Sequence, residues 1–218
     1  SDHAPYLFDE TWYYSHYRMF VEQIDEYVSS INTLKREYQS DIKIYLGFEL
    51  EYYKNTHQRE MAFLKKYNPD YLILGQHFVG GETTGCYVAC QDDDNILTQY
   101  VSECIEALKT GHFTYIAHPD IIGYDYSSEA IEREYTRLLN FCKENGYPIE
   151  INCLGLANRR WYPRRKIFEL ASNIGNEVII GIDAHSPTVI SKQTFENARN
   201  FAYGLNLNII EKVNLIKP

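Results

Sequence analysis

The sequence alternates short apolar, β-branched runs with amphipathic helical stripes, and this alternation limits the folds open to the chain. The clearest stripe begins at Phe20, after which apolar residues recur at spacings of three and four: Ile24, Tyr27, Val28, Ile31 and Leu34. Strands that alternate with helices pair in parallel through right-handed crossovers. The sequence therefore predicts an α/β fold built on a parallel sheet.

Five apolar runs predict the strands of this sheet. They are "IKIYLGFELEYY" (42–53), "YLILGQHF" (71–78), "FTYIAHPD" (113–120), "PIEINCLG" (148–155) and "VIIGIDAH" (178–185). Helices are predicted from residue 20 to 34, and near 58–67, 95–110, 128–145, 164–174 and 187–203. Because the runs are apolar on both faces, the sheet is covered on both sides or closed into a barrel.

Length and composition limit the class of protein. A chain of 218 residues with 44% apolar residues can bury one sizeable core, so we expect a single domain over residues 1–218. The net charge of -9 argues against nucleic acid as a partner. We find no leader peptide and no apolar run near the ~18 residues of a membrane span, so we expect a cytoplasmic protein without a membrane partner.

Side chains that bind metals follow four of the predicted strands. Glu49, His77 and His118 each come after an apolar run, and Asp183 and His185 follow the last one. The carboxyl ends of parallel strands are where active sites assemble in such folds. Residues two apart in an extended strand point to the same side, so Asp183 and His185 can enter one site together.

Each residue also has a simpler interpretation. A lone histidine at a strand end is more often a hydrogen-bonded structural residue, and Glu49 could pair with a lysine. The coincidence across four strands, together with Asp2-His3 before the first helix, favours a metal site. His16, His57 and His112 lack such a pattern, and we expect them to be surface or packing residues.

The ligand set consists of imidazoles and carboxylates without thiolates. It suits zinc, manganese or iron in a catalytic role. The ligands outnumber those that one tetrahedral ion needs, and clustered ions are a usual device for phosphoester hydrolysis. The five cysteines are an odd number, and Cys86 and Cys90 are separated by three residues rather than two, so we expect reduced, mostly buried thiols.

Two adjacent arginines are candidates for binding a phosphate. Arg159 and Arg160 in "NRRWYP" lie just beyond the strand that ends at Asn152. A guanidinium group there could bind a phosphate with two hydrogen bonds. The alternative is that both arginines are merely solvated on a loop.

Taken together, these motifs resemble the PHP (polymerase and histidinol phosphatase) superfamily and, within it, the histidinol phosphatase branch. The segments that carry the resemblance, in order, are "SDHAPY", "GFELEY", "LILGQHFVGG", "IAHPDI", "EINCLGL", "NRRWYP" and "GIDAHSP". The resemblance implies a distorted (β/α)7 TIM-like barrel with two or three divalent metal ions at its C-terminal face. It also implies hydrolysis of a small phosphate ester, L-histidinol phosphate, to L-histidinol and phosphate in histidine biosynthesis.

The resemblance also implies roles for individual residues. Glu49 would bridge two metals, His77 and His118 would complete the second metal's ligands, and Asp183 would bind the first. His3 and His185 would bind the third metal, and either could assist the leaving alkoxide; with Asp183 they are the catalytic candidates. Arg160, Arg159 and Asn152 would contact the substrate phosphate. The implied mechanism is attack by a metal-bridging hydroxide without a phosphoenzyme.

The sequence departs from the family at its start. The family begins with a strand that carries H-x-H, followed by another histidine, and none of these residues precedes Asp2-His3 here. We therefore expect a PHP domain that lacks its first strand and helix and that has two unpaired sheet edges. Such edges favour a homo-oligomer or a complementing N-terminal segment.

Two alternatives remain open at this stage. One is a PHP phosphoesterase that acts on another phosphomonoester, because fold and metal cluster do not choose the substrate. The other is a truncated metal-binding form with little or no activity.

Overall fold

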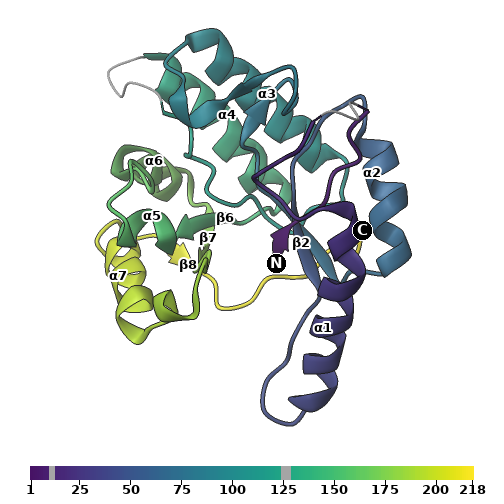
Figure 1. Cartoon of the computed structure of the whole chain (residues 1–218). Coiled ribbons are helices and arrows are strands. Elements are labelled where there is room, and N and C mark those ends of the chain that lie inside the picture. The colour runs from purple at the N-terminus through teal and green to yellow at the C-terminus, as the bar shows by residue number, and fades with distance from the viewer. Residues whose placement is uncertain (10–12, 124–128) are drawn as a thin grey trace.

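A computed structural model describes residues 1–9, 13–123 and 129–218 of the chain (Figure 1). Its main sheet is parallel, and the strands lie side by side in the order in which they occur along the chain. The strands are β1 (Asp2–His3), β2 (Gly47–Leu50), β3 (Tyr71–Leu74), β6 (Ile149–Asn152), β7 (Glu177–Gly181) and β8 (Asn208–Ile209). This arrangement confirms the predicted α/β class with a parallel sheet.

The predicted strand at 113–120 is present only as a narrow connection between β3 and β6. Ile116 forms single parallel bridges to Leu74 on one side and to Ile149 on the other. On the β6 side, Ile116 N donates to the carbonyl of Pro148, which itself has no N–H to extend the ladder. His118 then leaves extended geometry with a φ of 26°. The run is therefore shorter than predicted, although it joins the two halves of the sheet.

The six predicted helices are present, with shifted bounds. They are α1 (Ile24–Glu37), α2 (His57–Leu64), α3 (Asp94–Lys109), α4 (Glu129–Asn145), α6 (Arg165–Ile174) and α7 (Lys192–Tyr203). Helix α7 starts later than predicted because Pro187–Val189 forms a separate 3-10 turn, and the Ser191 side chain then caps α7 by accepting from Thr194 N at 3.1 Å. Further 3-10 turns span Val21–Gln23, Lys65–Tyr67 and Val88–Cys90.

Two elements were not predicted. The short helix α5 (Cys153–Ala157) follows β6 directly, and an antiparallel hairpin of β4 (Phe78–Val79) and β5 (Cys86–Tyr87) follows β3. The turns that form them begin within segments that the sequence suggested were strands. Both elements lie after the carboxyl ends of strands, where they help to surround the cleft described below.

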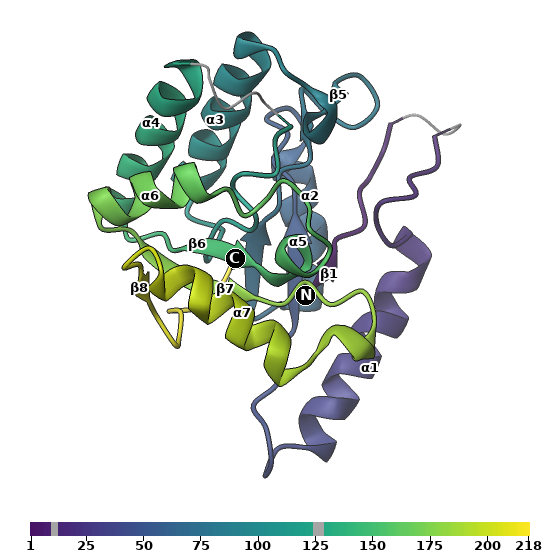
Figure 2. The same ribbon diagram turned by 90° about the vertical axis from the view of Figure 1, so that its left-hand side faces the viewer.

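One hydrophobic cluster extends through both halves of the sheet. Phe48, Leu74, Ile116, Ile151 and Val178 all belong to it and are fully buried. Helices α3 and α4 run along each other on one side of the molecule, while α5, α6 and α7 lie near β6 and β7 (Figures 1 and 2). The C-terminal segment runs back from β8 toward the other half of the sheet, where Ile216 N donates to Thr114 Oγ1 at 3.1 Å (Figure 1).

Helix α1 covers the core only in part. Its predicted stripe buries Ile24, but Leu34 stays 37% exposed. Tyr27 and Ile31 face a cavity of about 690 Å³ that is also lined by residues of β1 and of the segment after β7. Among the described residues, β1 and β8 each pair with one neighbour only, which leaves both edges of the sheet free.

The cysteines are reduced, and three of the five are buried. All five cysteines are free, but only Cys104, Cys142 and Cys153 are buried, while Cys90 is exposed. Across the part of the chain that the structure describes, no helix is both long and apolar enough to cross a bilayer.

Candidate metal centre

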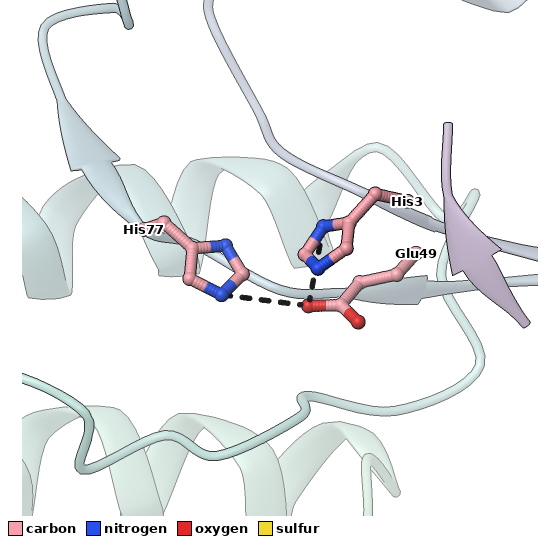
Figure 3. A group of neighbouring side chains, drawn as sticks. All are labelled: His3, Glu49 and His77. Atoms are coloured by element: carbon pink, nitrogen blue, oxygen red, sulfur yellow. Dashed lines mark ion pairs between the residues drawn. The ribbon is translucent and has the colours of Figure 1, made fainter. Parts of the chain in front are cut away.

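Three histidines converge on a single carboxylate oxygen. Glu49 Oε1 lies 3.1 Å from His118 Nε2, 3.7 Å from His77 Nε2 and 4.0 Å from His3 Nδ1. Figure 3 shows the rings of His3 and His77 approaching this oxygen from two sides. Four residues that are far apart in the sequence therefore meet near the carboxyl ends of neighbouring strands.

Strand register and backbone shape bring these side chains together. His3 is the register partner of Glu49 in the parallel pair β1–β2, so their side chains emerge at the same level. The positive φ of His118 ends its strand-like segment just where the ring meets Glu49. Gly75, just after β3, leaves space for the carboxylate, because a Cβ there would lie 1.9 Å from Glu49 Oε1.

The electrostatics of the cluster favour a charged carboxylate. Burial alone would raise the pKa of Glu49, but the hydrogen bond with His118 and the nearby imidazoles outweigh it and hold this pKa well below its usual range. Burial opposes charge on His118 too, yet its bond to Glu49 raises the pKa of this histidine to about 9. For His3, burial prevails and lowers the pKa.

The donor atoms fit a divalent transition-metal ion. Two ligand atoms that each lie about 2.1 Å from one tetrahedral ion are roughly 3.4 Å apart. The distances from Glu49 Oε1 to the three imidazole nitrogens range from 3.1 to 4.0 Å and bracket this separation. His3, Glu49 and His77 also each offer a ligand atom within 4.8 Å of the others. The cluster can therefore hold a cation with little rearrangement.

A second polar group lies near the histidine cluster, in β6 and just after β7. Asn152 Nδ2 donates to Asp183 Oδ2 at 3.0 Å and to Glu150 Oε2 at 3.1 Å, while His185 Nδ1 lies 3.4 Å from Asp183 Oδ1. Gly181 accommodates Glu150, since a Cβ there would lie 1.7 Å from Glu150 Oε1. Burial raises the pKa of Glu150 to about 7.

Asp183 and His185 of this second group line a cleft of about 420 Å³ together with the histidine cluster, whereas Asn152 and Glu150 line the cavity of about 690 Å³. Asp183, His185, His3, Glu49, His77 and His118 all line the smaller cleft. The six residues predicted to bind metals thus face one space, although only those around Glu49 are within direct contact distance of its carboxylate.

The structure distinguishes between the two predicted phosphate-binding arginines. Arg160 lines the cleft and donates to the hydroxyl of Tyr162 at 2.8 Å. Arg159 is exposed, has a φ of 50° and does not line the cleft. Asn152 is buried and contacts Asp183, so its amide group faces the acidic side of the site.

Sequence reasoning missed several polar residues at the site. It considered only the residue directly after each apolar run, and so passed over Glu51, Glu150 and Arg18. The available signal was alternation, because Glu51 follows Glu49 by two positions and therefore points to the same side of an extended chain. His16 is exposed as expected, but it also borders the cleft. His57 and His112 contact each other at 3.0 Å between Nε2 and Nδ1, away from the site.

Comparison with protein families is decisive for the first 153 residues. The profile of the PHP domain matches residues 1–153, well over half of the chain. The chain belongs to the PHP domain family. Glu49, His77 and His118 all lie within the matched region, whereas Asp183 and His185 lie beyond it.

Two curated relatives of this PHP protein carry matching names. A "Probable histidinol-phosphatase" of Deinococcus radiodurans is 24% identical over 194 residues, which cover 86% of this chain and 74% of the relative. The "Histidinol-phosphatase" of Bacillus subtilis is 27% identical over 165 residues, which cover 63% of this chain and 60% of the relative.

Two crystal structures share the fold of this PHP protein. One is a candidate histidinol phosphatase from Listeria monocytogenes, with a TM-score of 0.69, 21% identity and coverage of 89% of this chain and 86% of the other. The other is histidinol phosphate phosphatase from Lactococcus lactis, complexed with zinc, L-histidinol and phosphate; its TM-score is 0.69 at 16% identity, with coverage of 94% and 82%. At these identities the likeness establishes the PHP fold.

Proposed function

We propose that this PHP protein is a metal-dependent phosphomonoesterase that hydrolyses L-histidinol phosphate to L-histidinol and phosphate, a reaction of histidine biosynthesis. The observation that carries the proposal is the convergence of His3, His77 and His118 on Glu49 Oε1 in a cleft that Arg160 also lines. Two curated relatives named as histidinol phosphatases support the choice of substrate.

The ligands divide into two groups. Glu49, with His3, His77 and His118, would hold one or two ions, and Asp183 and His185 would complete a second or third position across the cleft. When bound, these ions generate a nucleophile from water at neutral pH and polarise the phosphoryl oxygens. Zinc is the first candidate, because imidazole and carboxylate suit it and the Lactococcus lactis structure contains it; manganese and iron are the alternatives.

The remaining residues would bind and orient the substrate. Arg160 would pair with the phosphate, its guanidinium already directed by the hydrogen bond with Tyr162. His3 and His185 border the cleft and are the candidates to deliver a proton to the leaving alkoxide. Asn152 would hold Asp183 in place through its 3.0 Å hydrogen bond.

We also propose that the free side of β1 pairs with an additional strand. Support comes from the cavity of about 690 Å³ beside β1 and from the partly uncovered α1, whose residues Tyr27 and Ile31 face that cavity. A strand there would close the space between β1 and the segment after β7 in the manner of a barrel. A second copy of the chain or an N-terminal peptide could supply it, and native mass spectrometry would distinguish the two.

The test is a comparison of kcat/KM for a panel of phosphomonoesters with the zinc-, manganese- and iron-loaded protein. Histidinol phosphate should exceed a sugar phosphate, a nucleotide and phosphotyrosine by at least about 100-fold, which corresponds to about 2.7 kcal/mol of transition-state discrimination. A different preferred ester would refute the proposed substrate. Absence of hydrolysis with every metal would refute the enzyme itself.

A further inference from the structure

We propose that a buried chain of charged groups, Glu82–Arg18–Glu51–His77, positions His77 for the metal centre, with Glu51 and Arg18 acting as positioning residues. The inference rests on the proposed function in one respect, namely that a cation binds beside Glu49. It adds residues outside the predicted ligand set. Two of them, Arg18 and Glu82, lie in loops that carry none of the predicted metal ligands.

The link between Glu51 and His77 comes first. His77 Nδ1 lies 3.0 Å from Glu51 Oε1, and the other ring nitrogen, Nε2, faces Glu49 Oε1 at 3.7 Å. Because Glu51 forms an ion pair with Arg18, its carboxylate accepts in this contact, and Nδ1 carries the proton. The lone pair of Nε2 is then directed toward Glu49. A carboxylate behind a ligating imidazole fixes both its tautomer and its ring orientation.

Arg18 pairs with Glu51 inside the protein. Glu51 is 2% exposed, so its carboxylate is shielded from water and depends on partners within the protein. The ion pair joins Arg18 Nη2 to Glu51 Oε2 at 3.1 Å, and both side chains are almost completely buried. Without Arg18, Glu51 would lose its buried ionic partner and, with it, the contact that directs its carboxylate toward His77.

Glu82 anchors the other end of the chain. Arg18 Nε donates to Glu82 Oε2 at 2.8 Å, and Arg18 Nη2 also contacts this oxygen. Tyr13 donates its hydroxyl proton to Glu82 Oε1 at 2.8 Å, and Ser15 donates to the same oxygen at 2.5 Å. Glu82 lies in the loop between β4 and β5, while Arg18 precedes α1. The two loops are therefore locked together behind His77.

The contacts of Arg18 extend beyond a single ion pair between two loops. An Arg18–Glu82 pair alone would join the two loops without involving Glu51. Arg18 instead contacts both carboxylates, and Glu51 turns its second oxygen toward the ring of His77. The two loops therefore help to fix the orientation of the His77 ring through Arg18 and Glu51.

The experiment measures zinc affinity of the purified full chain, by competition with a chromophoric chelator, for four variants. Glu51→Leu removes the acceptor for His77, and Arg18→Met removes the partner of Glu51. Glu51→Gln and Arg18→Lys are the conservative counterparts. The matched control is Glu134→Gln, a buried carboxylate 2.9 Å from Arg137 on α4, outside the cleft lining.

We expect Glu51→Leu and Arg18→Met to weaken zinc binding by roughly 10–100-fold, with Glu51→Gln and Arg18→Lys restoring part of the loss. Glu134→Gln should lower the melting temperature and leave zinc affinity unchanged. Wild-type zinc affinity in folded Glu51→Leu and Glu51→Gln would overturn the inference.

A second readout separates this inference from the proposed function. In metal-free, ¹⁵N-labelled protein, the Nδ1 proton of His77 should give an exchange-protected signal that disappears in Glu51→Leu. If wild-type protein fails to bind zinc but shows this signal, the proposed metal function fails, while the orientation of His77 by Glu51 and Arg18 is supported. If the signal is missing from wild-type protein, the positioning chain is refuted whatever the zinc affinity.

Discussion

Gly75 provides the space that the carboxylate of Glu49 occupies: a Cβ at this glycine would lie 1.9 Å from Glu49 Oε1 and 2.5 Å from its Cδ. Any residue other than glycine at position 75 would therefore collide with the Glu49 carboxylate unless that carboxylate moved. Because three imidazoles converge on the same oxygen, displacing it would disturb the whole cluster.

Gly75→Ala should therefore weaken zinc binding and reduce kcat/KM by at least about 100-fold, although the substitution adds a single methyl group. Gly204→Ala is the matched control, because a Cβ at Gly204, with its ordinary φ of -62°, would lie 3.2 Å from Asn200 O and 3.6 Å from Phe201 O, far less close than at Gly75. Isothermal titration with zinc measures the first effect. Equal zinc affinity in Gly75→Ala and Gly204→Ala would mean that Glu49 is not the central ligand.

Glu49→Gln keeps the shape of the side chain and removes its charge. We expect it to reduce bound metal as well as activity, because this carboxylate is shared by His3, His77 and His118. The measurement is the metal content of the dialysed protein by inductively coupled plasma mass spectrometry. Full metal occupancy in Glu49→Gln would count against its assignment as a shared ligand.

Arg160→Ala should weaken binding of substrate and of inhibitory phosphate while metal content stays at the wild-type level. Loss of one charge-assisted contact corresponds to about 1.5–3 kcal/mol, or roughly a 10–150-fold rise in the inhibition constant for phosphate. Arg159→Ala is the neighbouring control, since Arg159 does not line the cleft. Equal effects of the two substitutions would remove the distinction that the structure makes between them.

The pH dependence of stability should include a contribution from Glu60 on α2. This side chain is 1% exposed, and burial raises its pKa to about 7, against the opposing effects of a hydrogen bond from Leu7 N and the charge of Arg59. A raised pKa in the folded state means that the folded protein holds the proton more tightly than the unfolded chain. The contribution of Glu60 is then complete below about pH 4.5 and is lost as the pH rises through 7.

In the wild type, the free energy of unfolding should fall between pH 4.5 and 7 as Glu60 loses its proton. In Glu60→Gln this fall should be smaller by up to about 3 kcal/mol. Urea denaturation at a series of pH values measures it. Glu26→Gln, at an exposed position on α1, should leave the wild-type profile unchanged. A Glu60→Gln profile that parallels the wild type between pH 4.5 and 7 would contradict the burial argument.

The fold class was predictable because hydrophobic periodicity and apolar runs depend only on residues that are close together in the sequence. The stripe from Ile24 to Leu34 and the apolar runs near Glu49 and Asp183 depend only on neighbouring residues, and the corresponding elements are present. The narrowing at Ile116 was not predictable, since it depends on Ile116 pairing with Ile149 next to Pro148, which has no N–H to extend the ladder. Pairing partners are a property of the tertiary structure.

The residues of the site also divide into those that the sequence revealed and those that depend on tertiary contacts. Glu49, His77 and His118 could be found because each ends an apolar run in a parallel sheet. Arg18 and Glu82 could not, because they lie in loops whose contact with Glu51 exists only after folding. The separation between Arg159 and Arg160 likewise depends on a positive φ in a loop, which two adjacent identical residues do not reveal.

The central claim is that Glu49 holds a metal ion together with His77 and His118, and its most direct test is anomalous diffraction from crystals of the zinc-loaded protein. The account predicts a peak about 2.0–2.2 Å from Glu49 Oε1, His77 Nε2 and His118 Nε2, with a further peak near Asp183 and His185. Crystals soaked in zinc that show no anomalous peak beside Glu49 would contradict it.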